Sequence, residues 1–208
     1  MTTENPSEQW PPANCAPLAW PTLPSQAERF AWYRSVIEDY SLLWEGHVTQ
    51  ANLAPVSESD LSGLEARLGC PLPPALRAYH SEFGALSLAE KLCSVTNGET
   101  PIQPLLDAYS GISDIAENEA DIALASELVV FGDYLGNGNM FCFHRQTGEV
   151  YFFDHDTRAM LTPFFSSTQV YLDALMIRCL AEVHESDEGG EAVLVERFGN
   201  ALVRKWLY

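Results

Sequence analysis

Three apolar, β-prone runs lie in the middle of the chain, and their side chains follow a period of two. The runs cover residues 129–131, 139–144 and 149–154. Side chains that alternate in this way point to opposite faces of a β-strand. Two glycine-bearing segments separate the runs, and no catalytic motif stands within them. The pattern therefore predicts three consecutive strands that form a rigid β-meander.

The two connections between these strands carry different turn chemistry. The later one ends in Thr147-Gly148, where a glycine takes positive φ without a Cβ clash. This ending predicts a type I turn closed by a bulge, and hence an antiparallel hairpin. The earlier one, residues 132–139, holds three glycines and two asparagines, so several of its backbone positions can be left-handed. It is either a tight structural turn or part of a binding rim.

Helical periodicity precedes the strands. Apolar residues recur every three or four positions from Glu28 to Trp44, which predicts an amphipathic helix whose aromatic stripe faces the core. Ser57 is spaced to cap a second helix that ends at Gly69. Pro73-Pro74 suits the first turn of a third helix. The first half of the chain is therefore predicted to be helical.

The signals are weaker between residues 87 and 127, where only turns are indicated, at 96–98 and 110–111. After the strands, residues 164–183 predict a further helix. A break at 186–190, rich in acids and glycine, separates it from a final helix at 192–206.

Motifs in two halves of the chain are similar to those of the SUKH superfamily, known from its Smi and Knr founding members. The upstream motifs are a capped helix, a Leu-Pro dipeptide and the helix after it, and the downstream motifs are Gly-Asp, two spaced glycines and Thr-Gly-Glu-Val-Tyr. The positions that carry the resemblance are Glu65, Gly69, Leu72, Pro73, Gly132, Asp133, Gly136, Gly138, Gly148 and Val150. One departure leaves the local geometry open: Phe83-Gly84-Ala85 stands where the family usually ends its second helix with Asn-Gly.

The resemblance implies an α+β fold in which helices flank a central, mostly antiparallel sheet, with extra helical elements at the N- and C-terminal sides. We expect a proline-rich arm at 1–27 and a single SUKH-like domain at 28–208, with the family core at about 57–178 and a helical extension at 179–208. A chain of 208 residues, 47% of them hydrophobic, can bury a core of this size. Large apolar residues between the prolines favour an arm docked on the domain over a disordered tail.

Charge is the second main clue. The chain has 29 acidic and 11 basic residues, a formal net charge of −18, and such a field repels nucleic acid. It speeds encounter with a basic protein by about ten to a thousandfold at low salt. Five acids lie in one short span without Lys or Arg: Asp107, Asp114, Glu117, Glu119 and Asp121. They form either a docking surface for a basic partner or a solvated helix face, and an acidic surface can also serve solubility alone.

Several sequence features bear on location. No apolar run approaches the length of a membrane span, and the first residues lack the basic start and apolar stretch of a secretory signal. The five cysteines are odd in number and include no Cys-x-x-Cys pair, which favours reduced thiols. We therefore expect a cytoplasmic protein.

Candidate catalytic and metal sites are weak. Asp154-His155-Asp156 at a strand end could support general base chemistry, but a nucleophile motif is missing. Cys142 and His144 share a strand face and could bind zinc with His155, although packing in the core is the favoured interpretation. Asp133, Asn137 and Asn139 only partly resemble a calcium loop, and a turn is favoured. We predict no catalytic residue, no metal and no cofactor.

The resemblance implies an immunity protein that binds and neutralises a cognate bacterial toxin, such as a nuclease or deaminase, without chemistry of its own. We expect an acidic surface to occlude a basic substrate cleft on that toxin, with no nucleic acid or membrane as direct partner. The predicted contact residues are Asp107, Asp114, Glu117, Glu119, Asp121, Asp133, Tyr134, Leu135 and Asn137. The alternative is a regulatory or scaffold module that binds a protein without inhibiting it. A hydrolase of small molecules, built on Asp154-His155, is a minor third possibility.

Overall fold

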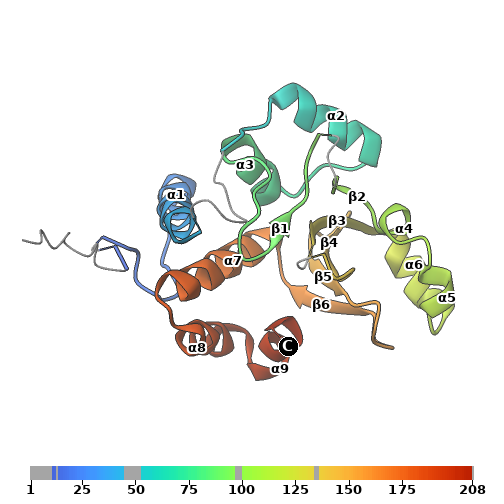
Figure 1. Cartoon of the computed structure of the whole chain (residues 1–208). Coiled ribbons are helices and arrows are strands. Elements are labelled where there is room, and N and C mark those ends of the chain that lie inside the picture. The colour runs from blue at the N-terminus through green and yellow to red at the C-terminus, as the bar shows by residue number, and fades with distance from the viewer. Residues whose placement is uncertain (1–10, 13, 45–52, 97–99, 134–135, 208) are drawn as a thin grey trace, which may run out of the picture. The chain divides into compact units, whose positions relative to one another are not determined.

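The computed structural model describes residues 11–12, 14–44, 53–96, 100–133 and 136–207. The chain divides into two compact parts (Figure 1). A central part comprises residues 52–173, and a terminal part comprises residues 1–51 and 174–208. The predicted single domain at 28–208 stays a prediction.

The central part is built on a six-stranded sheet with strand order β1-β3-β4-β5-β6, in which β2 also pairs with β3. All pairs of named strands are antiparallel. The strands are β1 (Lys91–Leu92), β2 (Gln103–Pro104), β3 (Leu128–Asp133), β4 (Met140–His144), β5 (Val150–Phe153) and β6 (Leu161–Phe165). The predicted meander is confirmed as β3, β4 and β5, and the α+β fold class is confirmed with it.

The hairpin between β4 and β5 forms because its turn has the required backbone. Gly148 has φ +72°, and its amide donates to the His144 carbonyl at 2.8 Å. The His144 amide donates in turn to the Glu149 carbonyl at 2.8 Å, which closes the bulged turn. The predicted antiparallel hairpin is confirmed.

One face of the sheet carries a layer of aromatic rings. Phe141 lies at its centre, with ring centroids 5.0 Å from Phe152 and 4.8 Å from Tyr171. The register explains this layer, because Phe141 and Phe152 are directly opposite on β4 and β5. Each fully buried Phe side chain contributes about 2 kcal/mol to stability, so the layer is a large part of the core.

The strand β6 was not predicted. Residues 164–183 were expected to be one helix, but Phe164 and Phe165 end β6, and helix α7 (Thr168–Val183) begins three residues later. The predicted helix is confirmed from residue 168 to its end, and only its start was wrong, because both Phe rings join the aromatic layer, 5.7 and 6.3 Å from the Phe141 ring. Pro163 has no amide hydrogen to donate. It is tolerated in β6 because, in the part of the chain that the structure describes, β6 is an edge strand that pairs with β5.

Two helices precede the sheet, α2 (Glu58–Leu68) and α3 (Pro74–Glu82). The Ser57 hydroxyl accepts from the Asp60 amide at 3.1 Å, and Gly69 ends α2 at φ +67°. Both ends of α2 are therefore confirmed as predicted, as is the proline at the first position of α3.

Three short helices lie between β2 and β3: α4 (Leu105–Ala108), α5 (Ile112–Ile115) and α6 (Glu119–Ser126). They carry the acidic span. Tyr109, directly after α4, packs its ring 5.1 Å from Phe153. Because Phe153 alternates with Phe152 along β5, these helices lie on the face opposite the aromatic layer (Figure 1).

The terminal part contains α1 (Gln26–Leu43), the later turns of α7, α8 (Asp187–Phe198) and α9 (Asn200–Leu207). The core face predicted for α1 is confirmed at Tyr33, Ile37 and Tyr40, which are all buried. The predicted break after α7 is present but shorter than 186–190, since α7 ends at Val183 and residues 187–190 already form the first turn of α8. The single final helix predicted at 192–206 is wrong, because a second break at Gly199, with φ +84°, divides it into α8 and α9.

Gly190 in α8 packs closely against α7. A Cβ on Gly190 would lie 2.3 Å from the Ala181 Cβ, so only glycine fits there. In a sequence pattern, glycine indicates a helix break, because the pattern contains no information about a helix that packs against it.

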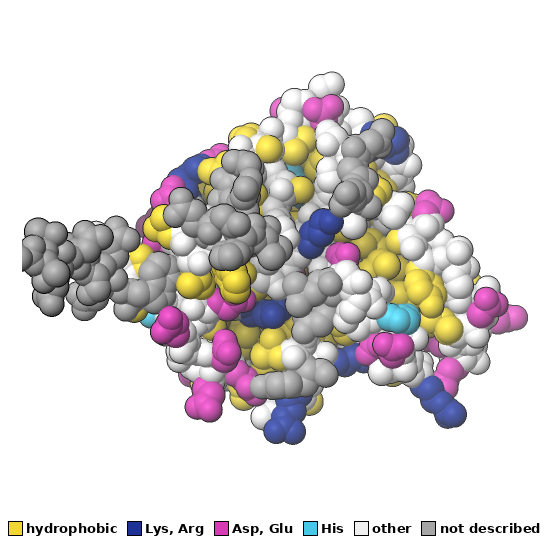
Figure 2. Space-filling model, in the orientation of Figure 1, with side chains coloured by type: hydrophobic (Ala, Val, Ile, Leu, Met, Phe, Trp, Pro, Cys, Tyr) yellow, Lys and Arg dark blue, Asp and Glu magenta, His cyan; other side chains and the backbone are white. Residues whose placement is uncertain are grey.

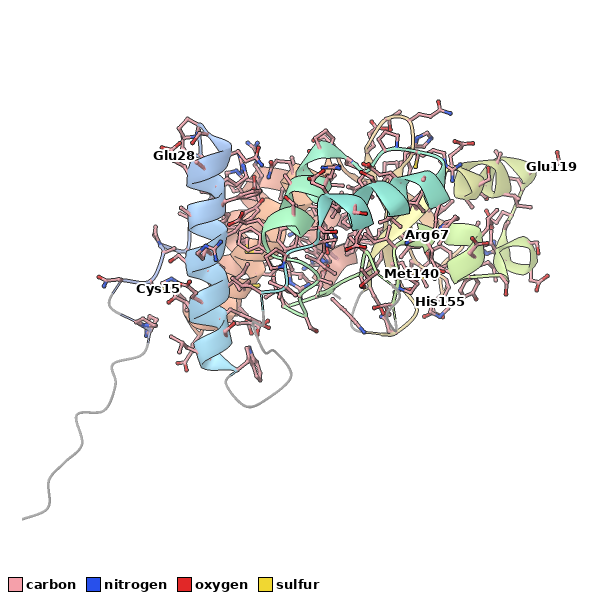
Figure 3. All side chains as sticks on the ribbon, turned by 90° about the horizontal axis from the view of Figure 1, so that it is seen from above. Cys15, Glu28, Arg67, Glu119, Met140 and His155 are labelled. Carbon is pink, nitrogen blue, oxygen red and sulfur yellow. The ribbon has the colours of Figure 1, made fainter. Side chains whose placement is uncertain are left out.

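The arm is docked within the described residues. The Trp20 ring lies 5.3 Å from the Phe198 ring, and the Arg197 guanidinium lies 5.3 Å from the Trp20 ring. The His184 Nε2 contacts the Ala16 carbonyl at 2.8 Å, so the ring nitrogen donates this bond. The docked interpretation is confirmed for residues 16–20, and Figure 3 shows the neighbouring Cys15 beside α1.

The tight fit of Gly190 generates a stability prediction. Gly190→Ala should lower the free energy of unfolding by about 2 kcal/mol through overpacking. Gly63→Ala is the matched control, because only the Arg67 Nη1 lies near its Cβ, at 3.9 Å. It should raise stability by about 1 kcal/mol through helix propensity. Chemical denaturation measures both changes, and equal effects of the same sign would contradict the packing account.

Burial of His80 generates a pH prediction. Burial lowers the pKa of His80 from 6.5 to about 4, and neither ring nitrogen has a hydrogen-bond partner among the described residues. The unfolded chain therefore takes up a proton that the folded chain does not, and stability is lost as the pH falls from 6.5 toward 4. From about pH 7 to about pH 5, His80 should lower the free energy of unfolding by about 2 kcal/mol.

Denaturation of His80→Leu at both pH values checks this. The variant should remove that loss, because leucine does not titrate and leaves no unpartnered nitrogen. Leu76→Ala, at a buried residue of the same helix that does not titrate, should lower stability and keep the wild-type pH dependence. An unchanged slope in His80→Leu would show that another group is responsible.

Candidate protein-binding surface

The turn between β3 and β4 is shaped by its own side chains. The Asp133 Oδ1 accepts from the Gly136 amide at 3.0 Å, and the Asn137 Oδ1 accepts from the Asn139 amide at 2.9 Å. Gly136 and Gly138 have φ +73° and +92°, which favours glycine at both positions. Tyr134 and Leu135, predicted as contact residues in this turn, lie outside the described residues.

His155 joins this turn to the end of β5. The Asn139 Oδ1 lies 3.3 Å from the His155 amide and 3.0 Å from its Nδ1. A Cβ on Gly138 would lie 2.9 Å from the His155 Cε1, so the ring lies directly on that glycine. The His155 Nε2 is 3.4 Å from the Asp156 Oδ1, an ion pair only when the ring is protonated.

The acidic helices reach the same place through Tyr109. Its ring centroid is 5.9 Å from that of His155 and 5.1 Å from that of Phe153. Arg158, beyond β5, lies 3.8 Å from the Glu117 carboxylate. This pair is highly exposed and adds little stability, but it also connects the segment after β5 to the acidic helices. Figure 3 shows His155 beside Met140, with Glu119 at the outer end of the helical layer.

The five acids of the predicted docking surface lie on this layer. Asp107 is on α4, Asp114 on α5, Glu119 and Asp121 on α6, and Glu117 in the link before α6. All but the half-buried Asp121 are exposed. The Asn118 side chain caps α6 by accepting from the amides of Ala120 and Asp121. The structure therefore brings the acidic span and the β3–β4 turn, far apart in sequence, to neighbouring positions around His155.

Sequence reasoning missed two apolar residues on this layer. Leu106 on α4 and Ile122 on α6 are 38% and 37% exposed, among the most exposed large apolar side chains of the described residues. Figure 2 shows an apolar stretch over α4 to α6 with acidic side chains along its outer margin. No sequence signal distinguishes these residues from core residues, because helices this short have no readable periodicity.

The motif positions mostly have local structural roles. The Glu65 carboxylate accepts from the Leu72 amide at 3.0 Å and lies 3.3 Å from the Arg77 Nε. Pro73 is the residue before α3, and Val150 is fully buried in β5. A Cβ on Gly132 would lie 3.1 Å from the Tyr171 hydroxyl, so glycine lets Tyr171 approach the sheet. These residues shape the scaffold from which the turn projects.

Comparison with known families agrees with this geometry. The sequence model of the SMI1 / KNR4 family (SUKH-1) matches residues 55–174, more than half of the chain. The chain belongs to this family. The match includes the whole sheet, the acidic helices and the β3–β4 turn. A search among curated proteins finds no match.

The candidate metal-binding and nucleophilic side chains of this SUKH domain are buried or hydrogen-bonded. Cys142 is fully buried, and burial raises its pKa well above the ordinary value of 9.0. The His144 Nδ1 accepts from the Gln146 amide at 3.2 Å, while His155 is engaged by Asn139. Within the part of the chain that the structure describes, no three His, Cys, Asp or Glu side chains are grouped to hold a metal ion. The side-chain oxygens of the supposed calcium loop bond to backbone amides instead.

Among the described residues, no helix has both the length and the apolar character that a membrane span requires.

The glycines of the SUKH turn can be separated by substitution. Alanine is strained at positive φ in both Gly136 and Gly138, but only at Gly138 does its Cβ meet His155. We expect Gly138→Ala to cost about 1 to 2 kcal/mol more than Gly136→Ala in chemical denaturation. Gly136→Asn should be nearly neutral, because asparagine tolerates the left-handed region. Equal costs for the two alanine variants would argue against a close His155 contact.

Proposed function

We propose that this SUKH protein is an immunity protein that binds a cognate secreted bacterial toxin and occludes its active site. The observation that carries the proposal is the junction at His155, where the acidic helices α4 to α6 meet the β3–β4 turn. It supports a single recognition surface made from two segments that are separate in the sequence. Membership of the SMI1 / KNR4 family agrees with such a role.

The charge of this surface suits a toxin that acts on nucleic acid. An enzyme of that kind presents a basic cleft to its substrate, and the same cleft attracts an acidic protein. The net charge of −18 adds a long-range field that accelerates the encounter. Specificity then comes from the particular loops and short helices on the shared scaffold.

Affinity requires more than charge, because exposed ion pairs contribute little by themselves. Leu106 and Ile122 supply apolar area on the acidic layer. An apolar centre with a polar rim is the usual anatomy of a protein interface, and a few central residues supply most of the binding energy. We assign these two residues as anchors, together with Asp133 and Asn137 on the turn.

We further propose that the protein acts by binding and not by catalysis, in the cytoplasm, where a toxin directed at nucleic acid acts. The alternative is a scaffold protein that holds a peptide with its tryptophan-bearing arm. The contacts of Trp20 with Phe198 and Arg197 favour the immunity role, because this part of the arm is already engaged within the chain.

Co-expression in bacteria with the protein encoded beside its gene tests the proposal. We expect the neighbour to be toxic alone, and survival together with co-purification when this chain is present. A harmless neighbour, or death without a complex, would contradict the immunity role for that pair. If bacteria survive expression of the neighbouring protein alone, and that protein forms a stable complex with this chain, the scaffold alternative would be favoured.

Charge reversal maps the surface. Asp114→Lys with Glu117→Lys should weaken binding at least about tenfold, mainly through a slower and less salt-dependent association rate. Glu149→Lys, at the opposite end of β4, makes the same change of charge per residue and should have little effect. Ile122→Ala should weaken binding about tenfold through faster dissociation. Surface plasmon resonance at two salt concentrations separates these effects, and equal losses for Glu149→Lys would contradict the assigned surface.

A further inference from the structure

His155 links its own turn after β5 to two other segments of the central part. It bonds to Asn139 of the β3–β4 turn, packs against Tyr109 after α4, and lies beside Asp156 in its own turn. We propose that His155 is the positioning residue that holds the β3–β4 turn and the acidic helices together as one preformed recognition surface. This inference rests on the proposed function for its biological meaning.

The hydrogen bonds indicate which nitrogen of the His155 ring carries a proton. The His155 backbone amide can only donate, so its partner atom on Asn139 at 3.3 Å is the oxygen. The ring Nδ1, 3.0 Å from the same oxygen, therefore carries a proton and donates. One amide oxygen thus accepts two bonds from one residue, which ties the C-terminal end of the turn to the residues that follow β5.

Two further contacts restrict the position of the ring. Gly138 leaves no room for a Cβ, since that atom would be 2.9 Å from the His155 Cε1. Tyr109 packs on the ring and on Phe153 of β5. Tyr109 is itself close to Gly111, whose Cβ would be 3.3 Å from its ring. The contacts run from the glycine turn through His155 and Tyr109 to the start of α5.

Positioning matters because a surface made of separate loops must otherwise be ordered when the partner binds. That ordering reduces affinity, and a surface held in its bound conformation avoids the loss. Two of the three segments come from loops with glycine at positive φ or from helices of four residues, which have little stability of their own. The His155 side chain contacts both segments and can therefore hold them together.

Two substitutions separate the hydrogen bond from the ring contacts. His155→Asn keeps a donor near the Nδ1 position and removes the ring. His155→Phe keeps a ring on Gly138 and Tyr109 and removes the donor. His155→Ala removes both, and His144→Ala is the matched control at the opposite end of β4.

Amide hydrogen exchange of the full chain, followed by NMR, tests the local part without any partner. We expect the amides of residues 139 and 155 to exchange about fivefold faster in His155→Phe and His155→Ala, and near the wild-type rate in His155→Asn. His144→Ala should leave these amides unchanged. Unchanged exchange in His155→Ala, or equal acceleration across the amides of β4 and β5, would overturn the positioning role.

Binding to the protein encoded beside the gene tests the recognition part. We expect His155→Ala to lower the association rate and to weaken Kd about tenfold, with partial rescue by His155→Asn. If wild type binds and His155→Ala binds equally well, the positioning proposal is overturned while the proposed function stands. If wild type does not bind that protein, the proposed function fails for the pair, whatever the exchange rates.

Discussion

The aromatic layer on one face of the sheet is the contact on which the rest of the central part depends. Tyr171 of α7 packs its ring on Phe131 and on Phe141 at the centre of this layer, and its hydroxyl donates to the fully buried Glu90 at 2.8 Å. A buried charged side chain requires partners, so this bond and the surrounding rings must form together. Gly132 permits the close approach of Tyr171. The end of β3, where the candidate surface begins, is fixed by this arrangement.

The candidate surface begins at the ends of β3 and β5, and its acidic helices lie on the face of the sheet opposite the aromatic layer. Asp133 ends β3 and bonds to the turn, while Phe153 ends β5 and receives Tyr109. Strand register therefore sets the distance between the turn and the acidic helices. A rigid sheet that carries variable turns is a suitable scaffold for recognition, because the turns can change while the register stays. The family match over residues 55–174 covers the elements that provide this scaffold.

Charge and shape contribute differently to the proposed binding. The acidic excess belongs to the whole chain and acts over distance, where it affects the rate of encounter and depends on salt. The exposed Leu106 and Ile122 act only on contact and affect how long a complex lasts. The proposed role of the His155 junction is to hold the surface in its binding conformation, which affects the association rate. The two kinds of interaction predict different kinetic signatures, which is why charge reversal and apolar truncation are informative together.

The sequence by itself determined the local structure wherever the backbone chemistry was strong. Ser57 and Gly69 marked the ends of α2, Gly148 marked the hairpin, and the alternation of residues marked β3 to β5. Each of these depends on neighbours within a few residues. Charge composition likewise determined the class of partner to be expected.

Tertiary structure decided the features that depend on contacts between distant residues. The two phenylalanines before α7 became a strand because of the aromatic layer, and Gly190 became part of a helix because Ala181 lies against it. The sequence marks His155 only as a weak catalytic candidate, and the structure alone shows its contacts with Asn139 and Tyr109, on which its proposed positioning role rests. No local pattern carries this information, because each contact joins residues at least nine positions apart and its energy exists only when the chain is folded.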